Sequence, residues 1–451
     1  MKRRTFLQHG PASTALLAMP TLSIGPQSVL GANDRVVLAG IGIGGRNNSL
    51  LRGFVQLADV SIKTLCDCNP NRSPIDDLGR FIENVSDRQP QLETDMKRVF
   101  EDPEIDAVSI ATPDHWHGPA AIFACQANKD VYVEKPISHN IWEGRKMVEA
   151  AQRYNRVVQC GTQNRSAAYN REAVDYIQSG KLGRVHFIKI FNMKPGSPYT
   201  EGPRADIPEG LDYDRWLGPA PYRPYFDGIL HSWKMYWDFT AGDLADDGAH
   251  QLDLGRWLIG RDLPIRVHSA GGNLAFNDDR EVPDTLATTY EFDDDLLMTF
   301  ELTQWAPYMK KTPYDVRGGD QFPLWMQSAT RIEVYGTEGM MMMGRHGGGW
   351  QVFSNDGDVV AQAYGRFPDM LSPDPHKRNF IDCIKSRATP NADILNGHFS
   401  ACLIHLASVA TRVGNAQLDF DPLREQITNH DDANALVKRI YRPPYIVPDQ
   451  V

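Results

Sequence analysis

A glycine-rich turn near the start of the chain limits most strongly what this sequence can fold into. Four apolar residues, 36–39, run into Gly40-x-Gly42-x-x-Gly45, and residues 47–58 then carry a helix-like apolar pattern. A buried strand that passes through such a turn into a helix is typical of a dinucleotide-binding unit, although a plain tight turn is the alternative. In that unit we expect Gly40 to make the turn, Gly42 to let the backbone approach a pyrophosphate, and Gly45 to let helix and strand pack closely.

The next apolar run, residues 60–66, ends at Asp67, which lies 22 residues beyond Gly45. A dinucleotide fold places at this point the acid that binds the adenosine ribose hydroxyls. The same carboxylate repels a 2′-phosphate, so Asp67 favours NAD over NADP. Arg72 follows closely and is suited to the phosphorylated cofactor, so NADP stays open as the second candidate. The structural alternative for Asp67 is an aspartate in an ordinary strand-end turn.

Strand-like and helical segments alternate as far as residue 160. Apolar runs at residues 107–111, 131–133 and 157–160 are separated by helical patterns, which predicts a parallel α/β sheet. Each run ends in a polar cluster, and such sheets bind ligands outside the carboxyl ends of their strands. The residues that we expect to bind the cofactor at this edge are Gly40, Gly42, Gly44, Gly45, Arg46, Asp67, Thr112, His117, Glu134, Lys135, Gln163 and Asn164.

The chain after residue 160 predicts a second domain of α+β type. A helix at residues 171–179 and a strand at 185–192 precede the loop 193–225, which is too long for an ordinary connection and indicates function. Later strand-like runs predict a large, mainly antiparallel open sheet covered on one face. They span residues 265–270, 285–292, 296–304, 331–335, 340–343 and 350–354, with helices at 376–386 and 395–414. We therefore expect a signal peptide (1–32), a Rossmann domain (33–160) and a C-terminal domain (161–445).

The first residues predict export. Lys2-Arg3-Arg4-Thr5-Phe6-Leu7 resembles a twin-arginine signal, and the apolar stretch 11–30 is too interrupted by proline for a membrane-spanning helix. A disordered basic tail is the alternative. We expect a periplasmic or otherwise exported protein with no stable membrane span. Loss of the leader changes the formal charge from −10 to −13, and an acidic chain argues against binding nucleic acid or an anionic membrane surface.

Neither the cysteines nor the histidines have the spacing of a metal site. The six cysteines are better interpreted as small buried apolar residues, and their pairing after export stays open. His115 and His117 stand two residues apart but lack a third ligand at a convincing distance in sequence. We therefore expect no metal.

Several motifs taken together resemble the Gfo/Idh/MocA oxidoreductase family, in particular its exported bacterial members. They are the glycine turn, Ala111-Thr112-Pro113 with His117, Glu134-Lys135-Pro136, Gly336-Thr337-Glu338-Gly339, Asn379–Ile384 and Tyr441-Arg442-Pro443-Pro444. The resemblance covers nearly everything after the leader. It implies a Rossmann domain, an open-sheet domain that serves as a dimer or tetramer face, and NAD(P)-dependent chemistry on a carbohydrate or polyol. It also places the loop of His117 against the nicotinamide.

Lys135 is the first candidate for catalysis. Pro136 biases it away from a helix, so that its side chain points from the strand end into the cleft. Beside a positively charged nicotinamide ring and partly buried, its pKa could fall far enough for proton transfer. A surface ion pair with Glu134 is the alternative. The resemblance assigns this lysine to catalysis.

Asp246, His250 and Asp253 would share one face of a helix, either as proton-transfer groups or as a solvated stripe. The family pattern Asp-x-Gly-x-His matches residues 246–250. The resemblance therefore assigns His250 as a general acid/base and Asp246 as its orienting partner or as a substrate hydrogen-bond acceptor. Asp247 stands where the family commonly has an apolar residue, which leaves the identity of the substrate open.

The sequence thus predicts an NAD(P)-dependent oxidoreductase acting on a CH–OH group of a sugar, polyol or sugar derivative. Tryptophans in the second domain suit the faces of sugar rings, although core and interface packing explain them equally well. Outside the cytoplasm we expect the cofactor to be held tightly and recycled in the site. A redox-neutral, NAD-dependent glycoside hydrolase or lyase is the second hypothesis. A non-catalytic sugar-binding protein is the third.

Overall fold

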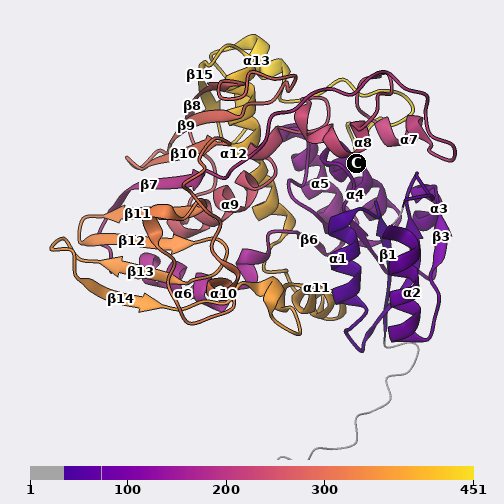
Figure 1. Cartoon of the computed structure of the whole chain (residues 1–451), viewed down its shortest axis with the longest axis horizontal. Coiled ribbons are helices and arrows are strands. Elements are labelled where there is room, and N and C mark those ends of the chain that lie inside the picture. Colours follow the sequence, from indigo (N-terminus) through magenta and orange to yellow (C-terminus); the bar gives the residue numbers. More distant parts are fainter. Residues whose placement is uncertain (1–34, 73) are drawn as a thin grey trace, which may run out of the picture.

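Two β-sheets organise the chain, and each carries its own set of helices (Figure 1). This computed structural model describes residues 35–72 and 74–451. The signal peptide predicted at residues 1–32 lies outside the described residues.

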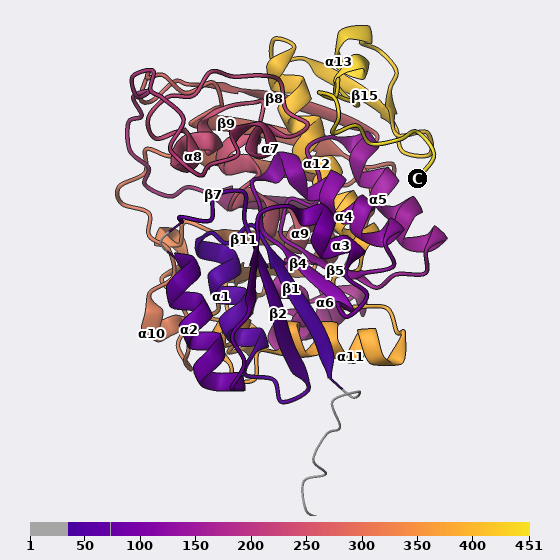
Figure 2. The same ribbon diagram turned by 90° about the vertical axis from the view of Figure 1, so that its right-hand side faces the viewer.

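The first sheet is parallel throughout, with the strand order β3-β2-β1-β4-β5-β6. This is the doubly wound order of dinucleotide-binding folds, in which the direction of winding reverses between β1 and β4. Helices α1 and α2 pack on one face of the sheet, and α4 and α5 pack on the other (Figure 2). The strands are β1 (Val36–Ile41), β2 (Val60–Cys66), β3 (Gln91–Glu93), β4 (Ala107–Ile110), β5 (Asp130–Val133) and β6 (Val158–Cys160). The helices are α1 (Gly45–Phe54), α2 (Pro74–Ser86), α3 (Met96–Glu101), α4 (His117–Gln126) and α5 (Ile141–Arg153).

The second sheet has ten strands in the order β14-β13-β12-β11-β7-β10-β9-β8-β15-β16. Only β7 and β10 pair in parallel, so the predicted, mainly antiparallel sheet is confirmed. The strands are β7 (Val185–Asn192), β8 (Arg266–Gly272), β9 (Thr285–Glu291), β10 (Leu297–Thr303), β11 (Arg331–Gly336), β12 (Gly339–Gly344), β13 (Trp350–Phe353), β14 (Val359–Ala363), β15 (Gln417–Asp421) and β16 (Gln426–Ile427).

Three helices, α6, α9 and α12, contribute to the apolar core on one face of this sheet. Along β10 the residues alternate between buried and partly exposed, as expected for a sheet that is covered on one side. The remaining helices are short or peripheral. In chain order the helices are α6 (Ala168–Gln178), α7 (Tyr213–Leu217), α8 (Ile229–Ser232), α9 (Gly248–Ile259), α10 (Tyr314–Arg317), α11 (Pro375–Ser386), α12 (Ile394–Arg412) and α13 (Asp431–Ala435).

One helix of the described residues, α12, is long and apolar enough to cross a membrane, with a mean hydropathy of 1.3 over its most apolar window. Its side chains are instead mostly buried inside the protein, because α12 contributes Leu403, Leu406 and Ala410 to the core of the second sheet. Its length and apolar character therefore reflect a place inside the fold.

The C-terminal part of the chain returns to the first sheet. Phe380 and Ile381 of α11 belong to the same apolar cluster as Phe54 of α1 and Tyr132 of β5. The ring of Phe380 lies edge-on to the ring of Tyr132, with centroids 5.7 Å apart. The sequence predicts a Rossmann domain that ends at residue 160, and it gives no sign of this return because the contact joins segments far apart in the chain.

Candidate functional site

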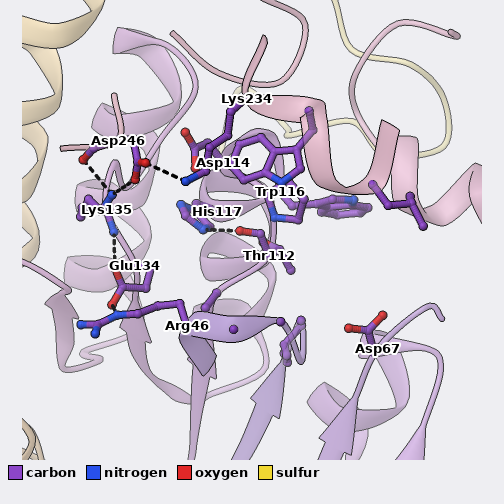
Figure 3. A pocket seen from close by; sticks show the side chains of 18 of the residues that line it. Arg46, Asp67, Thr112, Asp114, Trp116, His117, Glu134, Lys135, Lys234 and Asp246 are labelled. Atoms are coloured by element: carbon purple, nitrogen blue, oxygen red, sulfur yellow. Dashed lines mark hydrogen bonds and ion pairs between the residues drawn. The ribbon is translucent and has the colours of Figure 1, made fainter. Parts of the chain in front are cut away.

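A cavity of about 620 Å³ runs along the carboxyl edge of the first sheet and reaches the second lobe (Figure 3). The glycine turn 42–45 lines it, and so do Lys135 from the end of β5 and Asp246 and His250 from the second lobe. Ten of the twelve residues predicted to bind the cofactor line this cavity; Gly40 and Asn164 do not. Because the carboxyl ends of the strands meet at one edge, side chains that are distant in the sequence share one site.

The tight turn and the close helix packing are made by other glycines of the motif than predicted, whereas the approach of a pyrophosphate at Gly42 stays a prediction. Gly42 rather than Gly40 makes the turn, with a φ of +77°, and a Cβ there would lie 2.8 Å from the backbone nitrogen of Thr112. Gly40 lies in β1, where a Cβ would collide with the Leu51 side chain, so Gly40 rather than Gly45 allows α1 to pack closely. Gly45 has no neighbouring atom within 4 Å of its Cβ position, which leaves open space in front of the turn.

The N-terminus of α1 has the features of a phosphate site. Its N-cap residue is Gly44, no side chain caps its free N–H groups, and its first turn has no acidic residue. Uncapped N–H groups and the positive end of the helix dipole attract an anion. With the open space at Gly45, these groups fit the pyrophosphate of a dinucleotide.

Asp67 lies at the predicted position after β2 and lines the cavity. Its carboxylate accepts hydrogen bonds from the backbone N–H groups of Ile43, at 2.8 Å, and Asn69, at 2.9 Å. These bonds fix the carboxylate beside the glycine turn. Burial raises the pKa of Asp67 above its usual value. Arg72, which is suited to the 2′-phosphate of NADP, also lines the cavity and lies close to Gly44.

Lys135 is joined to Asp246 of the second lobe, 111 residues later in the chain. Its Nζ donates to the Asp246 carboxylate at 2.8 Å and to the Asp246 backbone carbonyl at 2.7 Å (Figure 3). Lys234 donates to the other carboxylate oxygen at 2.7 Å. Burial lowers the pKa of Lys135, but the carboxylates of Asp246 and Glu134 outweigh burial and leave this pKa above its usual value. These carboxylates therefore hold Lys135 as a cation and hydrogen-bond donor, and the fall of its pKa beside a charged nicotinamide ring stays a prediction.

His250 lies on α9 and is 5% exposed. Burial, together with the nearby cations Arg345 and Lys135, holds the pKa of His250 well below its usual value, so the imidazole is neutral at neutral pH. Its Nδ1 has no hydrogen-bond partner in the part of the chain that the structure describes. A neutral imidazole at the cavity wall is able to accept a proton.

The predicted helix face of Asp246, His250 and Asp253 does not form. Helix α9 begins at Gly248, so Asp246 lies in the preceding turn, from which its carboxylate reaches Lys135. Asp253 is fully buried and accepts hydrogen bonds from Arg165 at 2.9 Å. Asp253 is therefore a structural ion-pair partner and does not line the cavity.

Arg46 and Gln163 are anchored to acidic groups of the cavity wall. Arg46 Nε donates to Glu134 at 2.6 Å, and its Nη1 donates to Asp369 at 3.3 Å. Gln163 donates to the same Asp369 carboxylate at 3.2 Å. These bonds connect the first turn of α1 with the ends of β5 and β6.

His117 braces the loop after β4. One of its ring nitrogens lies 2.7 Å from the Pro136 carbonyl oxygen and the other lies 2.9 Å from that of Thr112. His117 and Thr112 both line the cavity, and this brace ties the Thr112 loop to the segment of Lys135. Asn164 is buried outside the cavity lining, and neither of its amide atoms has a partner within the described ranges.

Several charged residues of the cavity were not predicted from the sequence. Asp114 belongs to the polar cluster after β4, which was the signal available for it, and its carboxylate accepts a hydrogen bond from Thr240 at 2.6 Å. Arg317, the last residue of the short helix α10, and Arg345, which follows β12, come from segments of the second lobe with no recognisable motif. The long loop 193–225, predicted to be functional, contributes Trp216 to the lining.

Replacing Asp114 by asparagine is expected to change how stability depends on pH. Burial raises the pKa of Asp114 to about 6, from a usual value of 3.8. The folded protein therefore binds this proton more tightly than the unfolded chain, and the resulting stabilisation is lost as the pH rises from about 4 through about 6. The free energy of unfolding of Asp114→Asn, minus that of the unchanged protein, should rise by about 3 kcal/mol over this range.

Denaturant unfolding at a series of pH values measures this difference. Asp206→Asn, at an exposed carboxylate, is the matched control and should give a difference that does not change with pH. A flat difference for Asp114→Asn as well would show that this carboxyl group has an ordinary pKa.

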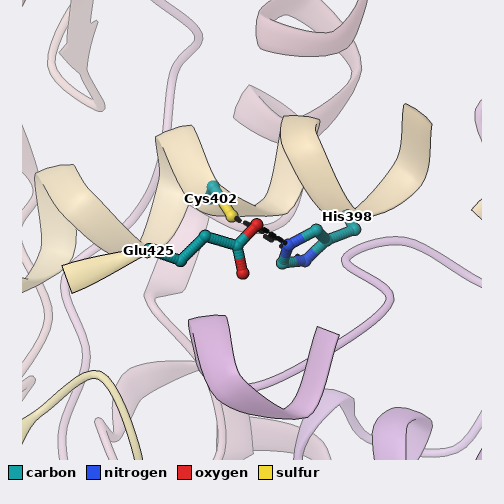
Figure 4. Close-up of side chains that lie close together, drawn as sticks. All are labelled: His398, Cys402 and Glu425. Atoms are coloured by element: carbon teal, nitrogen blue, oxygen red, sulfur yellow. Dashed lines mark hydrogen bonds and ion pairs between the residues drawn. The ribbon is translucent and has the colours of Figure 1, made fainter. Parts of the chain in front are cut away.

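A second cluster, outside the cavity, consists of His398 and Cys402 of α12 and Glu425 from the turn between β15 and β16 (Figure 4). Its potential ligand atoms lie within 4.8 Å of one another. The His398 ring lies 2.8 Å from one Glu425 oxygen, and Arg145 donates to both oxygens of this carboxylate. Because these groups already bond to one another, the cluster is a buried ion pair that ties α5 to α12.

Comparison with known proteins places this geometry in a family. Two Gfo/Idh/MocA profiles match the chain: "Oxidoreductase family, NAD-binding Rossmann fold" over residues 35–162, and "Oxidoreductase family, C-terminal alpha/beta domain" over residues 194–295 and 333–447. The scyllo-inositol 2-dehydrogenase (NAD(+)) of Bacillus subtilis is 25% identical over 301 residues, covering 66% of this chain and 72% of the relative.

Two further relatives are similar in part of the sequence or in fold. A glycosyl hydrolase family 109 protein of Shewanella pealeana is 30% identical over 151 residues, which is 32% of each chain. A levoglucosan dehydrogenase, solved in complex with NADH and levoglucosan, has a TM-score of 0.63 at 18% identity, covering 85% of this chain and 99% of that chain. The chain therefore belongs to the Gfo/Idh/MocA family and is an NAD-dependent oxidoreductase with a Rossmann domain and the C-terminal α/β domain of that family.

Proposed function

We propose that this enzyme oxidises a CH–OH group of a sugar, a polyol or a sugar derivative with NAD. The observation that carries the proposal is one continuous cavity that is lined both by the glycine turn and by Lys135, Asp246 and His250. The relatives named for inositol and levoglucosan dehydrogenation support a polyhydroxylated substrate. When bound, NAD supplies the acceptor for the hydride that leaves the carbinol carbon.

The residues of the cavity have complementary roles in this proposal. Lys135, kept cationic by Asp246, donates a hydrogen bond to the reacting oxygen and stabilises the negative charge that develops there. His250 is neutral and accepts the hydroxyl proton. Asp246 holds Lys135 in place and, through Lys234, fixes a second cation beside the site.

Two measurements test this function. Denatured protein is analysed for released NAD(H), and the folded protein with added NAD is offered a panel of monosaccharides, polyols and aryl glycosides. A change in nicotinamide absorbance with a sugar or polyol supports the proposal. Failure to bind NAD, or binding without exchange of hydride with any member of the panel, contradicts it.

A redox-neutral glycoside hydrolase or lyase is the second candidate. The relative of glycosyl hydrolase family 109 favours this reading over the part of the chain that it matches. In such a reaction the hydride leaves the sugar and later returns to it, so the cofactor shows no net change. Release of the aglycone from an aryl glycoside without net change in nicotinamide absorbance would identify this chemistry.

We also propose that the enzyme is exported in folded form, retains its cofactor in the site, and works as a homo-oligomer. The twin-arginine motif at residues 3–4 supports export, and a route for folded proteins suits a chain that closes around a dinucleotide. Tight retention would let the cofactor be recycled by a second substrate in the same site. Cell fractionation, the NAD content of the purified protein and its mass in solution test these three points separately.

A further inference from the structure

A cluster of charged residues surrounds Asp247 in the second lobe, and Asp247, Arg317 and Arg345 of this cluster line the cavity. Asp247 is in contact with three cations: Lys194 at 2.6 Å, Arg345 at 2.9 Å and Lys311 at 3.0 Å. Of these cations, Lys194 also pairs with the buried Asp243. The negative charges of Asp247 and Asp243 therefore balance only two of these three positive charges.

Arg317 is a fourth cation at this place, and it pairs with no carboxylate of residues 35–72 and 74–451. Its Nε donates to the Thr312 carbonyl at 2.8 Å, and its side chain lines the cavity. Burial and the neighbouring Arg345 lower the pKa of Arg317, as expected when two like charges lie close together. Arg317 is half-buried, so this unpaired positive charge lies at the cavity wall, where it attracts an anion.

Arg345 also has unused hydrogen-bonding capacity. It is 4% exposed, and its Nη1 donates to Asp247. Its Nε is buried and has no partner within the part of the chain that the structure covers. A buried guanidinium N–H without an acceptor is rare, because burial without a hydrogen bond costs free energy.

The backbone at Arg317, the last residue of α10, is packed against two neighbouring segments, one of which follows Arg345. The Arg317 carbonyl accepts the Phe367 N–H at 2.9 Å. Gly347, which follows Arg345 closely, has a φ of +83°, and a Cβ there would lie 2.8 Å from the same carbonyl oxygen. The cations are therefore positioned by the fold.

These cations are separate from the groups that fit the cofactor. The pyrophosphate fits the N-terminus of α1, whereas Arg345 contacts Asp247, the residue after the Asp246 that bonds to Lys135. An anion held by Arg317 and Arg345 would therefore belong to the molecule whose hydroxyl reaches Lys135 and His250.

We propose that the substrate is a sugar acid whose carboxylate is bound by Arg317 and Arg345. This proposal rests on the proposed function and narrows its substrate class to uronic or aldonic acids. A planar carboxylate accepts paired hydrogen bonds from guanidinium groups, which a neutral hydroxymethyl group does not. The reaction is unchanged: one CH–OH group becomes C=O, its hydride goes to NAD, and its proton goes to the site.

Equilibrium binding to the NADH-loaded protein tests this inference without relying on turnover. Glucuronate, galacturonate and gluconate are compared with their neutral counterparts glucose, galactose and glucitol, and with glucose 6-phosphate. We expect at least one acid to bind about ten to a hundred times more tightly than its neutral counterpart. Arg317→Gln should remove most of this preference and leave the binding of the neutral sugars unchanged.

Lys310→Gln is the matched control, because it removes a positive charge from an exposed residue of the same loop that does not line the cavity. It should leave the preference for the acid intact. Equal or tighter binding of the neutral sugars overturns the inference, and so does a preference for glucose 6-phosphate over every sugar acid. Because binding is measured directly, a preference for acids without hydride transfer would contradict the proposed function and support this inference.

Discussion

Replacing Lys135 by methionine is expected to lower kcat by about 10² to 10⁴ while NAD remains bound. Lys135 is the cation that the Asp246 carboxylate holds inside the cavity, and its Nζ bonds to Asp246 rather than to a group of the uncapped N-terminus of α1. The substitution keeps the length and apolar stem of the side chain but removes the charged donor. Steady-state kinetics with the substrate found in the panel, together with NADH fluorescence titration, separate turnover from cofactor binding.

The control for this substitution is Lys63→Met, which removes a buried lysine whose partners Asp102 and Glu104 lie outside the cavity. This variant should keep full turnover when it is assayed under conditions where circular dichroism shows it to be folded. Turnover of Lys135→Met close to that of the unchanged enzyme would remove Lys135 from the mechanism. Loss of NAD binding together with turnover would instead show that Lys135 serves the cofactor.

Replacing His250 by asparagine is expected to lower kcat by a similar factor of about 10² to 10⁴, with a smaller effect on KM. Asparagine keeps a hydrogen-bonding group in the cavity but does not accept a proton. Because burial and two nearby cations hold the pKa of His250 well below its usual value, its basic form prevails at neutral pH. Acidification to about pH 6 should therefore not reduce turnover through His250.

The measurement is a pH series of kcat and KM for the unchanged enzyme and for His250→Asn. His405→Asn, at a histidine of α12 that is also buried but does not line the cavity, is the matched control and should keep its kcat. If turnover of the unchanged enzyme were lost with an apparent pKa near the usual histidine value, and this loss vanished in His250→Asn, His250 would have to titrate in the neutral range. Our assignment would then be wrong.

Local sequence patterns predicted the helices and strands whose residues alternate regularly between a buried and an exposed face. Strand β7 has the predicted bounds, because its apolar residues lie in the middle of a sheet that is covered on one face. Strand β14 was missed since its residues are mostly exposed and carry no alternating pattern. Residues of β14 form a strand because they pair with β13, and the periodicity of the sequence does not predict such pairing.

In the candidate site too, some residues were predicted from local patterns and others were not. Residues in recognisable motifs, such as Lys135 and His250, were found because strand ends and the family pattern mark them. The ion pair of Lys135 with Asp246 was not predicted, because Asp246 reaches the cavity from another lobe. Arg317 and Arg345 were missed because no motif surrounds either residue. Only folding brings the two segments that carry them to the same cavity.

The return of helix α11 to the first sheet means that the nucleotide-binding lobe is not a portable module. An isolated fragment of residues 35–160 would lack Phe380 and Ile381. The apolar surfaces of Phe54 and Tyr132 that these residues cover would then be exposed to water. A fusion or a split version of this enzyme therefore has to keep helix α11 together with the first sheet.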